Sequence, residues 1–82
     1  METRVAVIGI IVEKPEAAEK VNVLLHEYGE HIIGRMGIPY REKGISIISV
    51  AMDAPQDIIS ALSGKLGRIG GVEVKTAYAK SY

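Results

Sequence analysis

The chain has no cysteine, no tryptophan and no phenylalanine among its 82 residues. The absence of cysteine excludes disulfides, thiolate metal sites and cysteine nucleophiles together. It also fits a reducing compartment, so we expect a cytoplasmic protein. A chain this short buries only roughly 60% of its unfolded surface and gains little stability from its core. With disulfides excluded, oligomerisation or a bound metal is the expected source of further stability.

A charge surplus and a long apolar run are also missing. Ten basic residues balance ten acidic ones. Binding to nucleic-acid phosphates normally needs a basic surplus, so no direct nucleic-acid partner is expected. The longest apolar run, 5–12, is far shorter than the roughly 20 residues of a membrane helix. We therefore interpret it as a buried strand and expect no membrane association.

Apolar residues recur with the spacing of strands in some segments and with the spacing of helices in others, which predicts one α+β domain over residues 1–82. Strand patterns cover 4–13, 31–40, 45–52 and 72–78. Helical stripes are formed by Ala17, Val21, Leu24, Leu25 and Tyr28, and then by Ile58, Ala61, Leu62 and Leu66 with Ile59 at the flank. Pro15 and Pro55 suit the first helical positions, and Asp53 is expected to accept hydrogen bonds from the first turn of the second helix.

The resulting element order is β-α-β-β-α-β. Right-handed crossovers place both helices on one face of a four-stranded antiparallel sheet with strand order 4-1-3-2, which is a ferredoxin-like sandwich. Gly34, Gly37 and Pro39 interrupt the second strand. Because glycine weakens a strand interior and proline is tolerated mainly at edges, this strand is expected at the rim of the sheet.

Two strands of this sheet are apolar on both faces, although helices can cover only one face. Whichever set of side chains meets the helices, the other set leaves an apolar patch on the open face. Patches of this kind are usually interfaces, so a homo-oligomer, either a dimer or a tetramer, is expected. The candidate interface residues, taken from both faces and from the second strand, are Ile8, Ile10, Gly34, Ile47, Ile48 and Val50.

The histidines are the first candidates for chemistry. His26 and His31 stand in the block HEYGEH with Glu27 and Glu30, which could bind a divalent metal. Their spacing matches no known ligand set, and metal sites need three or four converging ligands. Two surface histidines beside a turn is therefore the favoured interpretation.

Other catalytic and cofactor motifs are lacking. The serines have no G-x-S-x-G elbow around them. The glycine-rich block GKLGRIGG at 64–71 lacks the Ser or Thr and the upstream glycine of a phosphate loop. We therefore predict no cofactor and no enzymatic activity.

A basic cluster lies on the second strand and the hairpin tip. It consists of Arg35, Tyr40, Arg41 and Lys43. These side chains could hold an anion or touch a nucleic acid together, because planar guanidinium groups are the usual anion ligands. The alternative is a solvated hairpin in which Glu42 cancels one charge.

Three blocks carry a resemblance to a known family: HEYGEHIIG, RMGIPYREKGISIIS and GKLGRIGGVEVKTAYA. Together they resemble the regulators of the iron-only hydrogenase system, short stand-alone proteins of anaerobic bacteria, over essentially the whole chain. This resemblance implies a non-enzymatic regulator with a protein partner in hydrogenase maturation. It supplies no catalytic residues.

The predicted fold also resembles ACT domains and the C-terminal domain of the nickel-responsive repressor. In ACT domains, effectors commonly bind near the first strand–helix loop at a subunit interface. This resemblance implies an effector site in the loop from Val12 to Pro15. The candidate effector-binding residues are therefore Val12, Glu13 and Lys14 from this loop, together with Arg35 and Tyr40 from the basic cluster. The repressor's nickel site is not implied, because the chain has neither cysteine nor an H-x-H pair.

Three functions remain open at this point. The first is an oligomeric ACT-like module that senses a small effector. The second is a structural partner or assembly factor for hydrogenase maturation that binds no small molecule. The third is an enzyme with an unrecognised site.

Overall fold

Four strands and two helices follow one another in the predicted order. The computed structural model describes residues 2–80. Its elements are β1 (Arg4–Val12), α1 (Ala18–Glu27), β2 (Ile32–Tyr40), β3 (Ile45–Ala54), α2 (Gln56–Gly67) and β4 (Val72–Tyr78). Short 3-10 turns lie at Pro15–Ala17, Gly29–His31 and Arg41–Lys43. None of the helices within residues 2–80 is long and apolar enough to cross a membrane.

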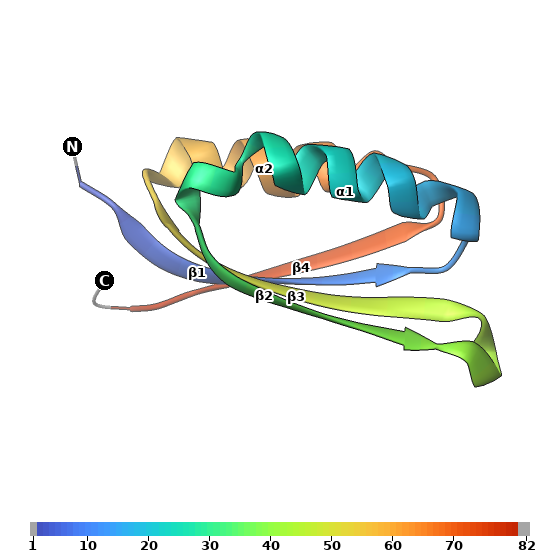
Figure 1. Cartoon of the computed structure of the whole chain (residues 1–82). Helices are drawn as coiled ribbons and strands as arrows, with labels where there is room; N and C mark the ends of the chain where they lie inside the picture. The colour runs from blue at the N-terminus through green and yellow to red at the C-terminus, as the bar shows by residue number, and fades with distance from the viewer. Residues whose placement is uncertain (1, 81–82) are drawn as a thin grey trace.

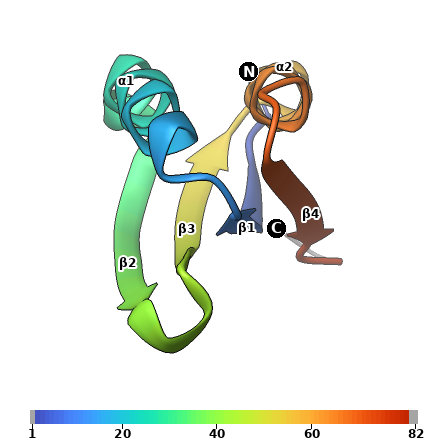
Figure 2. The ribbon, with the colours of Figure 1, turned by 90° about the vertical axis from the view of Figure 1, so that its right-hand side faces the viewer.

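The sheet has the order β2-β3-β1-β4, and every neighbouring pair is antiparallel. This is the predicted order read from the opposite edge, and β2 lies at the rim as its glycines and proline indicated. Both helices form one layer on one face of the sheet (Figure 1). Seen along the other direction, α1 and α2 stand side by side above the strands (Figure 2). The fold is therefore the ferredoxin-like, ACT-like sandwich.

Alternate side chains of β1 and β3 form the core beneath the helices. They are fully or almost fully buried at Ala6, Ile8, Ile10, Val12, Ile48, Val50, Met52 and Ala54. From the helices, the core receives Ala17, Val21 and Leu25 and then Ile59, Leu62 and Leu66. The pairing Ile8↔Val50 and Ile10↔Ile48 keeps these residues on the same face of the sheet. Strand alternation thus keeps one apolar set together under the helices and places the other set on the opposite face of the sheet.

This parity corrects four of the predicted interface residues. Ile8, Ile10, Ile48 and Val50 lie in the core, so they are wrong as members of an exposed interface. The sequence could not separate the two faces, because both faces of β1 and β3 are apolar. The other two candidates, Gly34 and Ile47, lie on the face away from the helices. Ile47 is next to the buried Ile48 on β3 and therefore points to the opposite face. Gly34 pairs with Ala51, which alternates in the same way with the buried Val50 and Met52.

The second helix is rotated relative to its predicted stripe. Ile59 is fully buried, Ile58 is half-buried and Ala61 is exposed. The expected cap at Asp53 is also wrong, because β3 continues through this residue to Ala54. The Pro55 carbonyl and the Asp57 carboxylate accept the N–H groups at the helix start instead. The strand β3 thus ends at Ala54 and extends beyond the predicted strand 45–52.

The two helices are also joined at the surface by a side-chain pair. The Lys65 ammonium donates to the Tyr28 hydroxyl at 2.9 Å and lies 5.3 Å from the centre of its ring. This hydrogen bond raises the pKa of Lys65. The pair fixes the end of α1 against the last turns of α2 and is remote from the hairpin.

Gly71 makes the tight turn into β4. Its φ is +84°, and a Cβ there would lie 2.8–2.9 Å from side-chain carbons of Lys14. Its carbonyl accepts the Glu13 N–H at 2.7 Å, which ties the end of β1 to the start of β4. The position therefore requires glycine on both conformational and steric grounds.

We expect Gly71→Ala to lower the free energy of unfolding by about 1–2 kcal/mol, the usual cost of a left-handed conformation for an L-residue. Urea denaturation measures the loss. Gly70→Ala is the matched control, because a Cβ at Gly70 meets nothing within 4 Å and its φ is ordinary. Equal losses in the two variants would contradict this account of the turn.

Candidate functional site

A groove runs between the beginning of α1 and the β2–β3 hairpin. It contains two hollows of about 190 and 250 Å³. Both hollows are lined by Ala18, Pro39 and Ser46, so they form one continuous depression. The far end of the β2–β3 hairpin diverges from the helix layer (Figure 1). We call this depression the hairpin groove.

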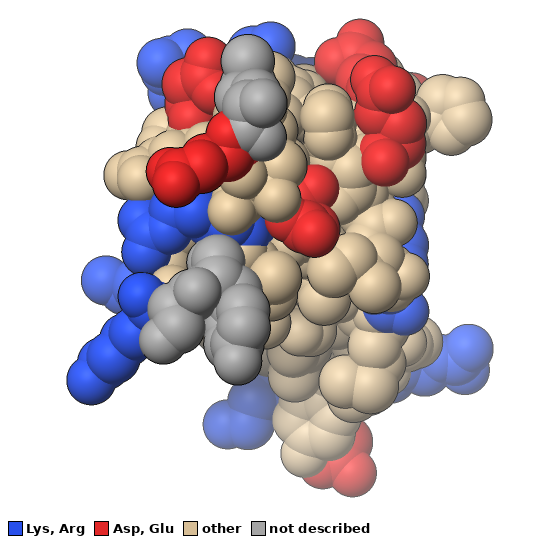
Figure 3. Space-filling view, turned by 90° about the vertical axis from the view of Figure 1, so that its left-hand side faces the viewer, with Lys and Arg blue, Asp and Glu red and all other residues tan. Residues whose placement is uncertain are grey.

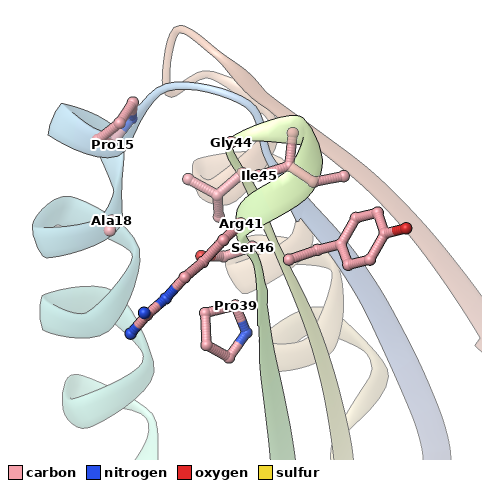
Figure 4. A pocket seen from close by; sticks show the side chains of 9 residues that line it. Pro15, Ala18, Pro39, Arg41, Gly44, Ile45 and Ser46 are labelled. Carbon is pink, nitrogen blue, oxygen red and sulfur yellow. The ribbon is translucent and has the colours of Figure 1, made fainter.

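Much of the hairpin groove is lined by small apolar residues. Ala18 lies on the helix side, Pro39 on β2, and Pro15 in the turn before α1 (Figure 4). Val12, which is buried, lines the same hollow, and Gly37 lines the second one. Small residues on both sides keep the helix and the hairpin from filling the space between them.

Two arginines supply the charge of the groove. Arg35 on β2 donates from Nη2 to the Asn22 side-chain oxygen on α1 at 2.9 Å. Arg41 lies at the hairpin tip, and its side chain extends across the opening toward α1 (Figure 4). Among residues 2–80, these arginines are the only charged side chains that line either hollow. These two hollows are therefore positive as well as apolar, whereas a further hollow on α1 that shares Ala18 with both of them is lined by Glu19 and Glu27.

The residues predicted for the effector site are only partly brought together. Val12 and Tyr40 line the first hollow, and Arg35 lines the second. Glu13 and Lys14 line neither, because the chain turns there toward β4 and packs against Gly71. The Tyr40 hydroxyl donates to the Glu42 carboxylate at 3.1 Å, which partly removes it as a ligand group.

Asn22 and Ser46 were missed by the sequence reasoning. Asn22 holds Arg35, and Ser46 contributes a hydroxyl to both hollows. Neither residue belongs to a motif. Asn22 only falls on the polar side of a helical stripe, and its link to Arg35 depends on how α1 crosses β2. Arg41 was part of the predicted basic cluster.

The second notable surface is the sheet face opposite the helices. It carries five exposed apolar side chains, with exposed fractions of 44% at Val7, 39% at Ile11, 59% at Met36, 46% at Ile38 and 39% at Ile47. The strand register places them on β1, β2 and β3 in neighbouring positions. We call this surface the open face.

A hollow of about 300 Å³ lies near the middle of the open face. It lies over Gly9, whose strand partners are Ser49 and Lys75. Glu73 and Lys75 on β4 flank it, with their side chains exposed. The open face thus combines an apolar centre with one charged border.

The two histidines lie around the end of α1. His26 is exposed, and His31 lies 3.9 Å from the Glu30 carboxylate through Nε2. Within residues 2–80, no three potential metal ligands of the His, Cys, Asp or Glu type converge. The arrangement of these histidines is that of two surface side chains beside a turn.

Charges of both signs are mixed over the end of the molecule that carries the chain termini (Figure 3). Acidic and basic side chains lie close to one another there, around an uncharged area. This mixture is what a formal net charge of zero predicts. The hairpin groove differs from this mixed surface, because the charged side chains that line its two hollows are both arginines.

Comparison with known proteins identifies related sequences. The profile of a family described as "TM1266-like: Iron-only hydrogenase system regulator, putative" matches residues 4–76. The solved structure of the uncharacterized protein TM1266 from Thermotoga maritima is 44% identical, with a TM-score of 0.92. This similarity covers 96% of the present chain and 100% of that one. No curated protein matches the sequence.

Two further solved structures share the fold alone. One is a formyltetrahydrofolate deformylase from Pseudomonas putida KT2440, at 13% identity and a TM-score of 0.67, where 95% of this chain matches 29% of that one. The other is CPII from Thiomonas intermedia K12, a nitrogen regulatory PII-like protein bound to ADP, AMP and bicarbonate. It is 15% identical, with a TM-score of 0.56 over 96% of this chain and 99% of that one.

Proposed function

We propose that this chain, which belongs to the TM1266-like family of iron-only hydrogenase system regulators, is a non-enzymatic, cytoplasmic regulatory module that binds a small effector and acts as a homo-oligomer. The observation that carries this proposal is the family match over residues 4–76. The hairpin groove is the proposed effector site, with Val12, Arg35 and Tyr40 retained from the prediction. Glu13 and Lys14 are given no role in it.

Two features of the molecule support this proposal. Small-molecule sites are usually concave and mostly apolar, with a few convergent polar groups, and the hairpin groove has this composition. The PII-like protein of similar fold is bound to ADP, AMP and bicarbonate in its structure. The shared fold alone does not transfer a ligand, so the choice of the effector site rests on the groove of this chain.

A thermal-shift screen over amino acids, nucleotides, organic acids and divalent metals tests effector binding. A ligand at 100 times its dissociation constant adds about 2.7 kcal/mol to the stability of the folded state and raises the melting temperature. The bound compound should be recovered chemically unchanged after prolonged incubation. Its conversion to a product would contradict the non-enzymatic role.

The second candidate function is an assembly factor for hydrogenase maturation that binds no small molecule. The observation that favours it is the open face, since exposed apolar surface of this extent serves protein contacts. In that case no compound in the screen shifts the melting temperature, and the chain co-purifies with a hydrogenase maturation enzyme.

We further propose that the open face is where two copies of the chain meet. An 82-residue chain is expected to be only marginally stable alone, and a second copy would cover the apolar side chains of β1, β2 and β3. Glu73 and Lys75 give the border of this face one charge of each sign, which suits pairing with an identical surface.

A further inference from the structure

We propose that the hairpin groove binds a small organic anion with an apolar body, and that Arg41 at one hollow and Arg35 at the other attract its acidic group. This inference names the chemical class of the effector and therefore rests on the proposed function. It follows from the charge, the hydrogen bonding and the size of the groove.

The charge of the groove is its most unusual property. The whole chain has equal numbers of acidic and basic residues, yet the two hollows are lined by two arginines and, within residues 2–80, by no carboxylate. Guanidinium groups stay protonated at any physiological pH. Both side chains are exposed, so the attraction for an anion comes from their two charges, one at each hollow, and from the hydrogen bonds that guanidinium groups donate.

The hydrogen bonding of Arg35 leaves its charge available. Its Nη2 donates to the Asn22 amide oxygen, which is neutral, so the bond orients the guanidinium without compensating it. Arg4 provides a contrast within the same chain. Its guanidinium donates to Gln56 and to the Ala79 carbonyl and lies over the Tyr78 ring at 4.4 Å, which uses its donors and its planar face.

The size and walls of the groove define the rest of the ligand. Hollows of about 190 and 250 Å³ are smaller than the roughly 300–1,000 Å³ of sites for drug-sized ligands. They fit a single ring or a short aliphatic chain. Pro15, Pro39 and Ile45 provide apolar contacts for such a body, and the Ser46 hydroxyl is available for one further hydrogen bond. A carboxylate and a phosphate monoester share the required chemistry.

Benzoate, phenyl phosphate and uncharged benzyl alcohol are suitable probes. We expect both anions to shift the ¹H–¹⁵N resonances of groove residues such as Ala18, Asn22 and Ser46 in a saturable way. Benzyl alcohol at the same concentrations should leave them unchanged. Tighter binding of benzoate identifies a carboxylate effector, and tighter binding of phenyl phosphate identifies a phosphate ester.

Single substitutions test whether the two arginines are responsible for anion binding. Arg41→Gln and Arg35→Gln should each weaken binding of the preferred anion by roughly tenfold or more, because each removes a charge-assisted hydrogen bond. Lys43→Gln is the control, since Lys43 lies on the same hairpin tip and does not line the groove. A well-dispersed spectrum of each variant shows that the fold is retained.

Two results would overturn this inference while leaving intact the proposal that the chain binds a small effector. One is a ligand from the thermal-shift screen that binds the chain without shifting groove resonances. The other is a Lys43→Gln variant that loses as much affinity as Arg41→Gln, which would indicate general surface electrostatics. If no compound of any class binds, the effector part of the proposed function fails as well.

Discussion

Ile47→Glu is expected to convert the protein from an oligomer into a monomer. Ile47 lies on the inner strand β3, in register with Ile38 and Ile11, at the centre of the open face. Against a second copy, the introduced carboxylate would be taken out of water without a partner, which costs several kcal/mol. We therefore expect association to weaken by at least a hundredfold. Sedimentation velocity at tens of micromolar would record the change.

Val23→Glu is the matched control for that experiment. Val23 is an apolar side chain on the outside of α1 with 54% exposure, more than the 39% of Ile47, and it lies on the opposite side of the molecule from the open face. Its substitution should leave the oligomer intact. A wild-type chain that sediments as a monomer at the same concentration would disprove the proposed interface, as would dissociation by both variants.

The absence of cysteine allows a second readout of the same interface. A single cysteine at Ile47 should form an intermolecular disulfide under mild oxidation if two open faces pack against each other near a two-fold axis. A single cysteine at Ile33, in the bulged part of the edge strand β2, should do so only if the chains pair edge to edge. The pattern of cross-linking therefore separates face packing from edge pairing.

Local patterns were enough to predict the order and type of the elements. The alternation of β-branched residues defined the strands, and Gly34, Gly37 and Pro39 correctly placed β2 at the rim. Strand parity in β1 and β3 could not be predicted. Both faces of these strands are apolar, so only the packing of α1 and α2 decides that Ile8 and Ile48 are covered while Ile47 is not.

The candidate site was harder to predict from the sequence than the fold was. The basic cluster on β2 and the hairpin tip was visible, but Arg35 and Arg41 are brought to one groove by the crossing of α1 over β2. The resemblance of the predicted fold to ACT domains directed attention to the first strand–helix loop. There, Glu13 and Lys14 serve the contact with Gly71, whereas Val12 lines the groove. Tertiary contacts of this kind leave no periodic signal in the chain.

The rotation of α2 can be tested with two neighbouring isoleucines. Ile59→Ala should lower the free energy of unfolding by about 2–5 kcal/mol, because it removes a fully buried side chain and leaves a cavity between α2 and the sheet. Ile58→Ala should cost less than half as much, since Ile58 is only half-buried. A loss at the upper end of this range is comparable to the whole stability of a small domain, which is about 5–15 kcal/mol.

Urea denaturation of both variants in the Ile47→Glu background gives the cleanest comparison. In that background the measured stability belongs to the single chain, whereas in an oligomer it would depend on protein concentration. Consecutive residues of a helix point roughly 100° apart, so a helix rotated by one position would exchange the roles of the two isoleucines. A larger loss for Ile58→Ala than for Ile59→Ala would therefore contradict the packing of α2 in which Ile59 faces the core.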